Sequence, residues 1–273
     1  MHAVHEDRSY PSNLPATAFA ANSMSFFAHW HAEVELIQVC EGSILVGINH
    51  ETRVLHQGDM AVCSSGDIHF YDCKGYDSII RLIIFRPELV DSAGGWPRAF
   101  AFDSPFFCGQ TCSALLRSYE NAFLAIKEEA TKKDALAPML VKGSLLTLCA
   151  TLARTASFHT IVTKKPAAGR HRMQSMQDAL SFIESNYMAD IRLQDAAAAA
   201  NMSIYHFSRL FMSVAGMGYK SYLSQLRVNK AEALLKNSDN TITEIALQCG
   251  FDSIRTFNRV FRAVHGSTPS RAR

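Results

Sequence analysis

The chain has 273 residues, a formal net charge of +2 and seven cysteines. This length suits two domains, each with its own core. The cysteines are odd in number and form no C-x-x-C pair, which argues against a disulfide framework and indicates reduced thiols in the cytosol. No apolar run reaches the ~18 residues of a membrane span, and the polar N-terminus lacks the apolar centre of a secretory signal, so we expect a cytoplasmic protein with no membrane segment.

The charged residues are unevenly distributed along the chain. Residues 1–163 carry 12 Lys and Arg against 17 Asp and Glu, whereas residues 164–273 carry 15 against 8. A basic half is typical of a surface that binds phosphate groups. We therefore expect the second half of the chain to contact nucleic acid, and the acidic first half not to.

The segment 26–85 predicts a small β-barrel. Turn-forming residues such as Glu41-Gly42 and Asn49-His50 separate short runs rich in apolar and β-branched residues. These runs are 34–39, 43–48, 53–55, 60–63 and 79–85. Strands this short, at regular spacing, suit a barrel better than an open sheet.

Three histidines and one glutamate in this segment match the ligand pattern of metal-binding cupins. The spacing H-x-H-x3-E-x6-G resembles the first cupin motif, and G-x5-S-x-G-x2-H resembles the second. The resemblance implies that a divalent metal such as Zn, Fe, Mn or Ni could bind at His29, His31, Glu35 and His69. The sequence departs from the cupin motifs at three positions, which are Ser23 for Gly, Ser64 for Pro and Cys73 for Asn.

Other interpretations of these four residues stay open. They could bind a small polar effector, such as a sugar, or they could satisfy backbone groups at a strand edge. As an alternative function, the barrel could be a metal-dependent cupin enzyme fused to a DNA-binding module. No additional acid-base pair and no nucleophile motif accompanies the cluster, so we expect no catalytic residues and no enzyme activity.

Two helices with apolar stripes are expected after the barrel, at 112–131 and 136–158. An apolar stripe alone does not show whether a helix covers a core or meets a partner. The stretch that follows combines Pro, Gly and basic residues, which is typical of a linker. The expected division is a first domain at 1–160, a linker at 161–172 and a second domain at 173–273, to which the resemblance described below assigns ligand sensing with dimerisation and DNA binding, respectively.

The segment 241–269 predicts two helices that meet at a sharp turn. Thr241 and Glu244 form a capping box, Gly250 suits a left-handed turn, and Asp252 or Ser253 caps the second helix. The second helix buries an apolar stripe and presents a cationic, polar face without any acid. That face consists of Arg255, Thr256, Asn258, Arg259 and Arg262.

The same helix-turn-helix pattern occurs earlier, with Asn201 at the turn. Asn is the next best residue after Gly for a left-handed conformation. Corresponding residues of the two units, such as Phe207 and Phe257, are 50 positions apart, which indicates an internal repeat. A helix near 219–236 is expected to join the two units.

At these residues the chain resembles the AraC/XylS family of bacterial transcription regulators. The pattern I-x-x-I-A-x3-G-F, then F-x-R-x-F and G-x-T-P-S, lies between Ile242 and Ser270, and the resemblance covers residues 173–273. One position departs from it, because Ala272 stands where the family usually has an aromatic residue. The resemblance implies an α+β chain: a cupin-like β-barrel with two helices, then an all-α domain with two helix-turn-helix motifs.

The resemblance also implies a function. We expect a sequence-specific DNA-binding regulator, more often an activator, whose N-terminal domain senses a small molecule. Its expected partners are double-stranded DNA, a small-molecule effector, a second copy of the chain in a homodimer and, for an activator, RNA polymerase. The two helices after the barrel would form the dimer face.

The second helix of each unit is expected to enter the major groove with its N-terminal half. Carried over by position, the contact residues are Tyr205, His206, Ser208 and Arg209 in the first helix, and Ile254, Arg255, Thr256, Asn258 and Arg259 in the second. Ile254 departs from the polar residue common at its position, and we expect His206 to contact the DNA backbone. Arg209 and Arg259 could instead form salt bridges within the protein.

Overall fold

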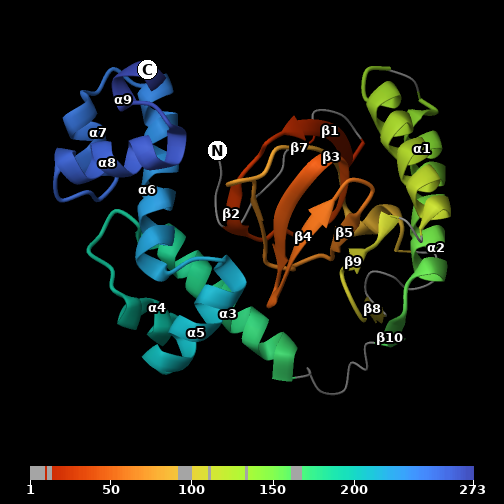
Figure 1. The fold of residues 1–273 in the computed structure, drawn as a ribbon, viewed down its shortest axis with the longest axis horizontal. Helices are drawn as coiled ribbons and strands as arrows, with labels where there is room; N and C mark the ends of the chain where they lie inside the picture. The colour runs from red at the N-terminus through yellow and green to blue at the C-terminus, as the bar shows by residue number, and fades with distance from the viewer. Residues whose placement is uncertain (1–9, 11–13, 92–99, 110–111, 133–134, 161–167) are drawn as a thin grey trace. The chain divides into compact units, whose positions relative to one another are not determined.

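The computed structural model describes residues 10, 14–91, 100–109, 112–132, 135–160 and 168–273. The described residues form two compact units, one within 10–160 and one at 168–273 (Figure 1). Residues 161–167 of the expected linker lie outside the described part, and residues 168–172 already belong to helix α3 (Ala168–Asn186). All seven cysteines are free, as predicted. Within the described ranges, none of the helices has the length and apolarity that a membrane crossing needs.

A curved antiparallel sheet forms most of the first unit, and helices make up the described part of the second, which confirms the predicted fold class (Figure 1). The strand order is β1-β7-β3-β5-β9, with β4 paired to β3 and β6 paired to both β3 and β2. The strands are β1 (Ala16–Asn22), β2 (Phe26–His29), β3 (Val34–Ile48), β4 (Glu51–His56), β5 (Met60–Cys63), β6 (His69–Asp72), β7 (Ser78–Phe85) and β9 (Phe106–Phe107). A separate two-stranded ladder joins β8 (Phe100–Phe102) and β10 (Phe158–Thr160).

Strand β3 corrects one prediction, because it is a single strand of 15 residues where the sequence predicts two strands and a turn. Its first half pairs with β5 and β7, and its second half pairs with β4 and β6. Gly42 has φ 71°, and a Cβ there would lie 1.8 Å from the Asp77 carbonyl oxygen. Gly42 therefore bends the strand instead of ending it, and one continuous strand contributes to both parts of the sheet.

Alternate residues of β3 face opposite sides of the sheet. Leu36 packs in a cluster with α1 (Ser113–Glu129) and α2 (Ala137–Thr155), whereas Ile37 belongs to the cluster on the other side of the sheet. The Tyr119 hydroxyl on α1 donates to the carbonyl of Leu36 at 3.3 Å. The helix pair thus covers one face of the sheet, and Glu35 faces the opposite side.

Helices make up the described part of the second unit. They are α3, α4 (Leu193–Ala199), α5 (Ile204–Ala215), α6 (Tyr219–Asn237), α7 (Ile242–Gln248), α8 (Ile254–His265) and α9 (Pro269–Ala272). The predicted capping box is present, since the Glu244 amide donates to Thr241 Oγ1 at 3.2 Å and the Thr241 amide donates to Glu244 Oε2 at 2.7 Å. The predicted left-handed turns are also present, at Asn201 (φ 53°) and Gly250 (φ 81°).

Gly250→Ala is expected to lower the free energy of unfolding by about 1–3 kcal/mol, because alanine is strained at a left-handed φ. Its Cβ would also lie 2.8 Å from the carbonyl oxygens of Tyr187 and Met188. Urea denaturation of the full-length chain, followed by circular dichroism, measures the loss. Asn201→Gly changes the equivalent turn without strain and should stay within about 0.5 kcal/mol. Equal losses of unfolding free energy in the two variants would show that an added Cβ at position 250 does not destabilise the turn.

Candidate functional site

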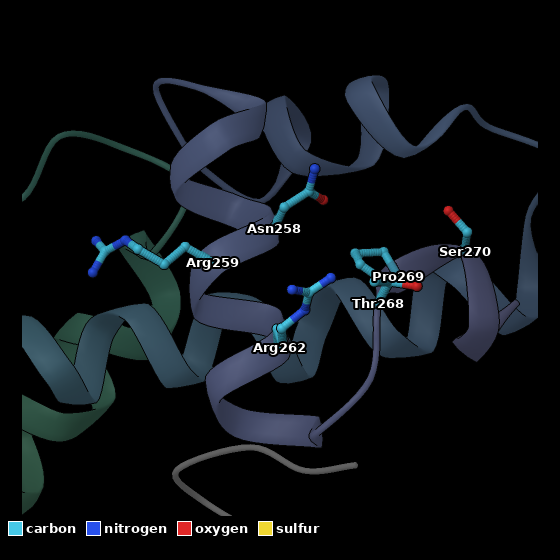
Figure 2. Close-up of a pocket in the computed structure, with 6 residues that line it drawn as sticks. All are labelled: Asn258, Arg259, Arg262, Thr268, Pro269 and Ser270. Carbon is cyan, nitrogen blue, oxygen red and sulfur yellow. The ribbon is translucent and has the colours of Figure 1, made fainter.

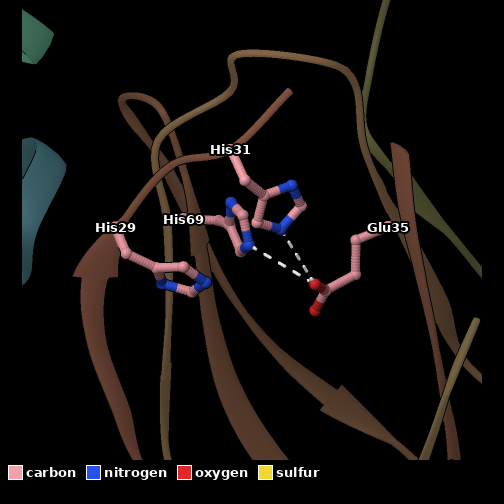
Figure 3. Close-up of side chains that lie close together, drawn as sticks. All are labelled: His29, His31, Glu35 and His69. Atoms are coloured by element: carbon pink, nitrogen blue, oxygen red, sulfur yellow. Dashed lines mark hydrogen bonds and ion pairs between the residues drawn. The ribbon is translucent and has the colours of Figure 1, made fainter. Parts of the chain in front are cut away.

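The four residues of the predicted cluster lie together in the first unit (Figure 3). His29 ends β2, His69 begins β6, and the pairing of these two strands places the two residues opposite each other. His31 lies in the connection between β2 and β3, and Glu35 follows on β3. Each is at most 2 % exposed, and one ligand atom from each lies within 4.8 Å of those of the others.

Backbone carbonyls fix the orientation of all three imidazole rings. The Nδ1 atoms of His29, His31 and His69 lie 3.1, 3.2 and 2.8 Å from the carbonyl oxygens of residues 27, 33 and 67. A carbonyl oxygen only accepts, so each Nδ1 carries a proton. The Nε2 atoms of His31 and His69 consequently face Glu35, at 3.1 and 3.8 Å from Oε2.

The electrostatics of the cluster favour an ionised carboxylate among the imidazoles. Burial raises the pKa of Glu35, but the hydrogen bond with His31 and the nearby His69 imidazole outweigh it and hold this pKa well below its usual range. Burial lowers the pKa of His29 well below that of a free imidazole, and the neighbouring His69 adds to the effect. For His69, burial is outweighed by Glu35, and the pKa is raised.

The donor set fits a divalent metal ion. The side-chain Nε2 of His69 is buried without a hydrogen-bond partner, and at 3.8 Å the Glu35 oxygen is beyond hydrogen-bonding range. Three imidazole nitrogens and one carboxylate oxygen are ligands that suit Zn, Fe, Mn or Ni. A cation between them would satisfy the unpartnered nitrogen and offset the buried negative charge.

Tyr71 belongs to the cluster, although neither cupin-like motif includes it. Its hydroxyl donates to Glu35 Oε1, which leaves Oε2 for the imidazoles. Burial, together with the charge of Glu35, raises the pKa of Tyr71 well above its usual value. Tyr71 is two residues after His69 on β6, so the alternation of a β-strand could have revealed it.

Asp67 holds the turn that leads into His69. The Ser64 amide and the Asn49 side-chain amide each donate to its carboxylate at 2.8 Å. Its own backbone carbonyl lies 2.8 Å from the Nδ1 of His69. Ser64, which replaces the proline of the cupin pattern, therefore contributes to this turn through its backbone amide.

The predicted DNA contacts lie on α5 and α8 in the second unit. The side chains of all nine predicted contact residues are exposed, whereas the phenylalanines on the opposite face of each helix are buried. Ser203 and Ser253 cap these two helices through their hydroxyls, which accept from the amides of His206 and Thr256.

The arginines of α5 and α8 are turned outward. The Arg209 guanidinium lies over the Tyr205 ring, 5.7 Å from its centroid. Within the described part of the chain, neither Arg255 nor Arg259 forms an ion pair or a hydrogen bond through its guanidinium. No internal salt bridge of these side chains therefore competes with a DNA contact among the described residues.

Comparisons with known proteins match both units. The family described as "AraC-like ligand binding domain" matches residues 17–145, and the family described as "Helix-turn-helix domain" matches residues 196–273. The HTH-type transcriptional activator RhaR of Klebsiella pneumoniae is 27% identical over 278 residues, covering 99% of this chain and 96% of RhaR. The uncharacterized HTH-type transcriptional regulator YdeC of Bacillus subtilis is 25% identical over 247 residues, covering 88% of this chain and 84% of YdeC. The solved DNA-binding domain of AdpA, in complex with a target DNA, is 30% identical; it covers 36% of this chain and 87% of that domain, with a TM-score of 0.34.

Proposed function

The chain belongs to the AraC family of transcriptional regulators, and we propose that both helix-turn-helix units bind one operator, in two successive segments of the major groove, to activate transcription by RNA polymerase. The observation that carries this proposal is the exposed polar face that recurs on α5 and α8, 50 residues apart. Relatives named as activators support the sign of regulation. Chromosomal DNA as the partner implies a cytoplasmic protein.

Each class of exposed side chain has a matching group on DNA. Arginine at positions 209, 255 and 259 can donate two hydrogen bonds to guanine, and Asn258 can pair with adenine. Ile254 can contact a thymine methyl group. Ser and Thr hydroxyls and His206 supply contacts to phosphates, which fix the position of the protein on the duplex.

Selection from sheared genomic DNA with the full-length chain tests the proposal. We expect enriched fragments that share two short motifs whose centres are about 10 bp apart, one helical turn of DNA. Absence of any enrichment at about 50 mM salt, where electrostatic binding to DNA is strong, would contradict it.

The effector site proposed for the first unit is the cluster of His29, His31, Glu35 and His69. Because their ligand atoms lie within 4.8 Å of one another, they suit an ion better than an organic molecule held between them. These four residues would hold a divalent metal, whose positive charge would be coordinated by side chains from β2, β3, β6 and the connection between β2 and β3. A sugar or another small polar effector would have to contact the outer edge of this cluster.

A metal-dependent enzyme is a second candidate function, and only the donor set favours it. Turnover of aromatic or sugar substrates by the metal-loaded, full-length chain would support it. If metal instead changes DNA binding without turnover, the cluster has a regulatory role.

The proposed homodimer uses the helix pair α1 and α2. Met139 and Leu140 on α2 are 73% and 53% exposed, and Leu124 on α1 is 45% exposed, although these helices also bury a stripe against the sheet. Exposed apolar side chains that lie together on neighbouring helices would form the kind of patch that marks an interface.

Replacing Met139 and Leu140 together by Glu is expected to shift a dimer to a monomer in analytical ultracentrifugation, because charged groups would enter an apolar interface. Neither side chain is buried in the monomer, so the variant should keep the far-ultraviolet circular dichroism spectrum of the wild type. A variant that keeps the sedimentation coefficient of a wild-type dimer would place the interface elsewhere.

A further inference from the structure

A hollow of about 450 Å³ lies between the middle of α8 and the segment that follows this helix (Figure 2). It is lined by Asn258, Arg259, Arg262, Thr268, Pro269 and Ser270. Figure 2 shows the Arg262 guanidinium directed toward Thr268, whereas the end of the Arg259 side chain points away from Thr268. The lining contains cations, hydroxyls and an amide, and no acidic residue.

The Arg262 guanidinium has no partner within the described part of the chain, neither an ion pair nor a hydrogen bond. It lies three residues after Arg259 and seven after Arg255, which is the spacing of one helix face. With the N-terminal half of α8 in the major groove, the later part of this face lies nearer the edge of the groove. Backbone phosphates line that edge.

The internal repeat shows that the fold does not require this arginine. At the position equivalent to Arg262, the first unit has Met212, which is exposed, and at the position of Thr268 it has Gly218. Both units nevertheless have the same helix, with the same buried phenylalanines and a left-handed glycine at its end. Lys220 replaces Ser270, so the first unit keeps a cation but lacks the arginine and the threonine hydroxyl.

We propose that this hollow binds one phosphate of the DNA backbone, held by Arg262 and by the hydroxyls of Thr268 and Ser270. The proposal rests on the DNA-binding function proposed above. A guanidinium donates to phosphate oxygens in a fixed, often bidentate geometry, and this contact is independent of base sequence. The second unit is thereby anchored to the backbone in a way that the first unit is not.

The test compares R262M, which introduces the residue of the first unit, with the wild-type chain. Fluorescence anisotropy measures binding to a selected operator and to a scrambled duplex of equal length, from 50 to 300 mM KCl. We expect R262M to lose roughly tenfold affinity for both duplexes. The slope of log affinity against log salt is expected to become shallower by about 1, because one fewer phosphate is neutralised.

Two variants serve as controls. R271A removes an exposed cation from α9 that does not line the hollow, and it should lose less affinity than R262M. R262K keeps the charge, and it should therefore retain the salt slope while losing part of the affinity.

An unchanged salt slope in R262M would overturn the proposal, and so would a loss confined to the operator, which would make Arg262 a base-reading residue. If the hollow instead binds a free phosphate ion, 10 mM inorganic phosphate at constant ionic strength should protect the wild type against thermal unfolding, with no change of salt slope in R262M. A wild-type chain that binds neither duplex would contradict the proposed function and this inference together.

Discussion

Protein purified without a polyhistidine tag, stripped of metal and titrated with Co²⁺ or Zn²⁺ is expected to bind one ion per chain. A ligand that binds only the folded state at 100 times its Kd stabilises by about 2.7 kcal/mol, which corresponds to roughly 5–10 °C in Tm for a domain of this size. The ion would occupy the space among His29, His31, Glu35 and His69, where the Nε2 of His69 is buried without a hydrogen bond. Thermal unfolding and the visible spectrum of bound Co²⁺ are the measurements.

Glu35→Gln is expected to lower metal affinity by at least about 100-fold, since replacing residues that merely support a ligand already costs 10–100-fold. Tyr71→Phe removes the hydrogen bond to Glu35 Oε1 without removing a metal ligand, and it should lower metal affinity about tenfold. Glu41→Gln is the matched control, because Glu41 carries the same charge on the same strand but is exposed. Equal affinities of wild type and Glu35→Gln would place the ion elsewhere, and less than one ion per wild-type chain would end the metal proposal.

The helix-turn-helix units could be predicted from the sequence because their determinants are local. The capping residue Thr241 and its partner Glu244 are three positions apart, and the residue types at 201 and 250 indicate the left-handed turns. The repeat added an independent check, since each unit predicts the other. Helix α3 was missed from Ala168 to Arg172, where Pro, Gly and basic residues indicated a linker.

The barrel was predicted less completely because distant contacts decide its strands. Glu41-Gly42 has the composition of a turn, but β3 continues through it, since Gly42 lies against the backbone of Asp77. Strand β1 was not predicted, and it is held by its pairing with β7, more than fifty positions along the chain. Such pairings leave no local pattern in the sequence.

The candidate sites divide in the same way. The four cluster residues follow from motif spacing, but Tyr71 joins them through a hydrogen bond that no motif includes. Arg262 was predicted on the cationic face of α8, but its hollow was not, because Thr268 and Ser270 come from the segment after the helix.

Arg255→Ala and Arg259→Ala are each expected to lower affinity for the operator by ~1–3 kcal/mol and to relax the base preference at the position each arginine contacts. The physical reason is the loss of two hydrogen bonds to a guanine edge, which water does not replace with the same geometry. Gel shifts with the selected operator and with single-base variants of it measure both effects.

Because both arginines are exposed and have no internal ion pair in the described ranges, neither substitution should change the unfolding temperature, and a loss of affinity would report on DNA contact. If the arginine reads a base, its replacement should lower the affinity of the protein for the operator more than its affinity for a scrambled duplex. If the arginine contacts a phosphate, its replacement should lower the affinity for both duplexes equally and make the salt dependence of binding shallower. The internal repeat allows a further comparison, because Arg209 on α5 is equivalent to Arg259. Arg209→Ala should relax the base preference at a position in the other half of the operator. Unchanged binding in both Arg255→Ala and Arg259→Ala would remove α8 from the recognition surface and leave α5 as the helix that reads sequence.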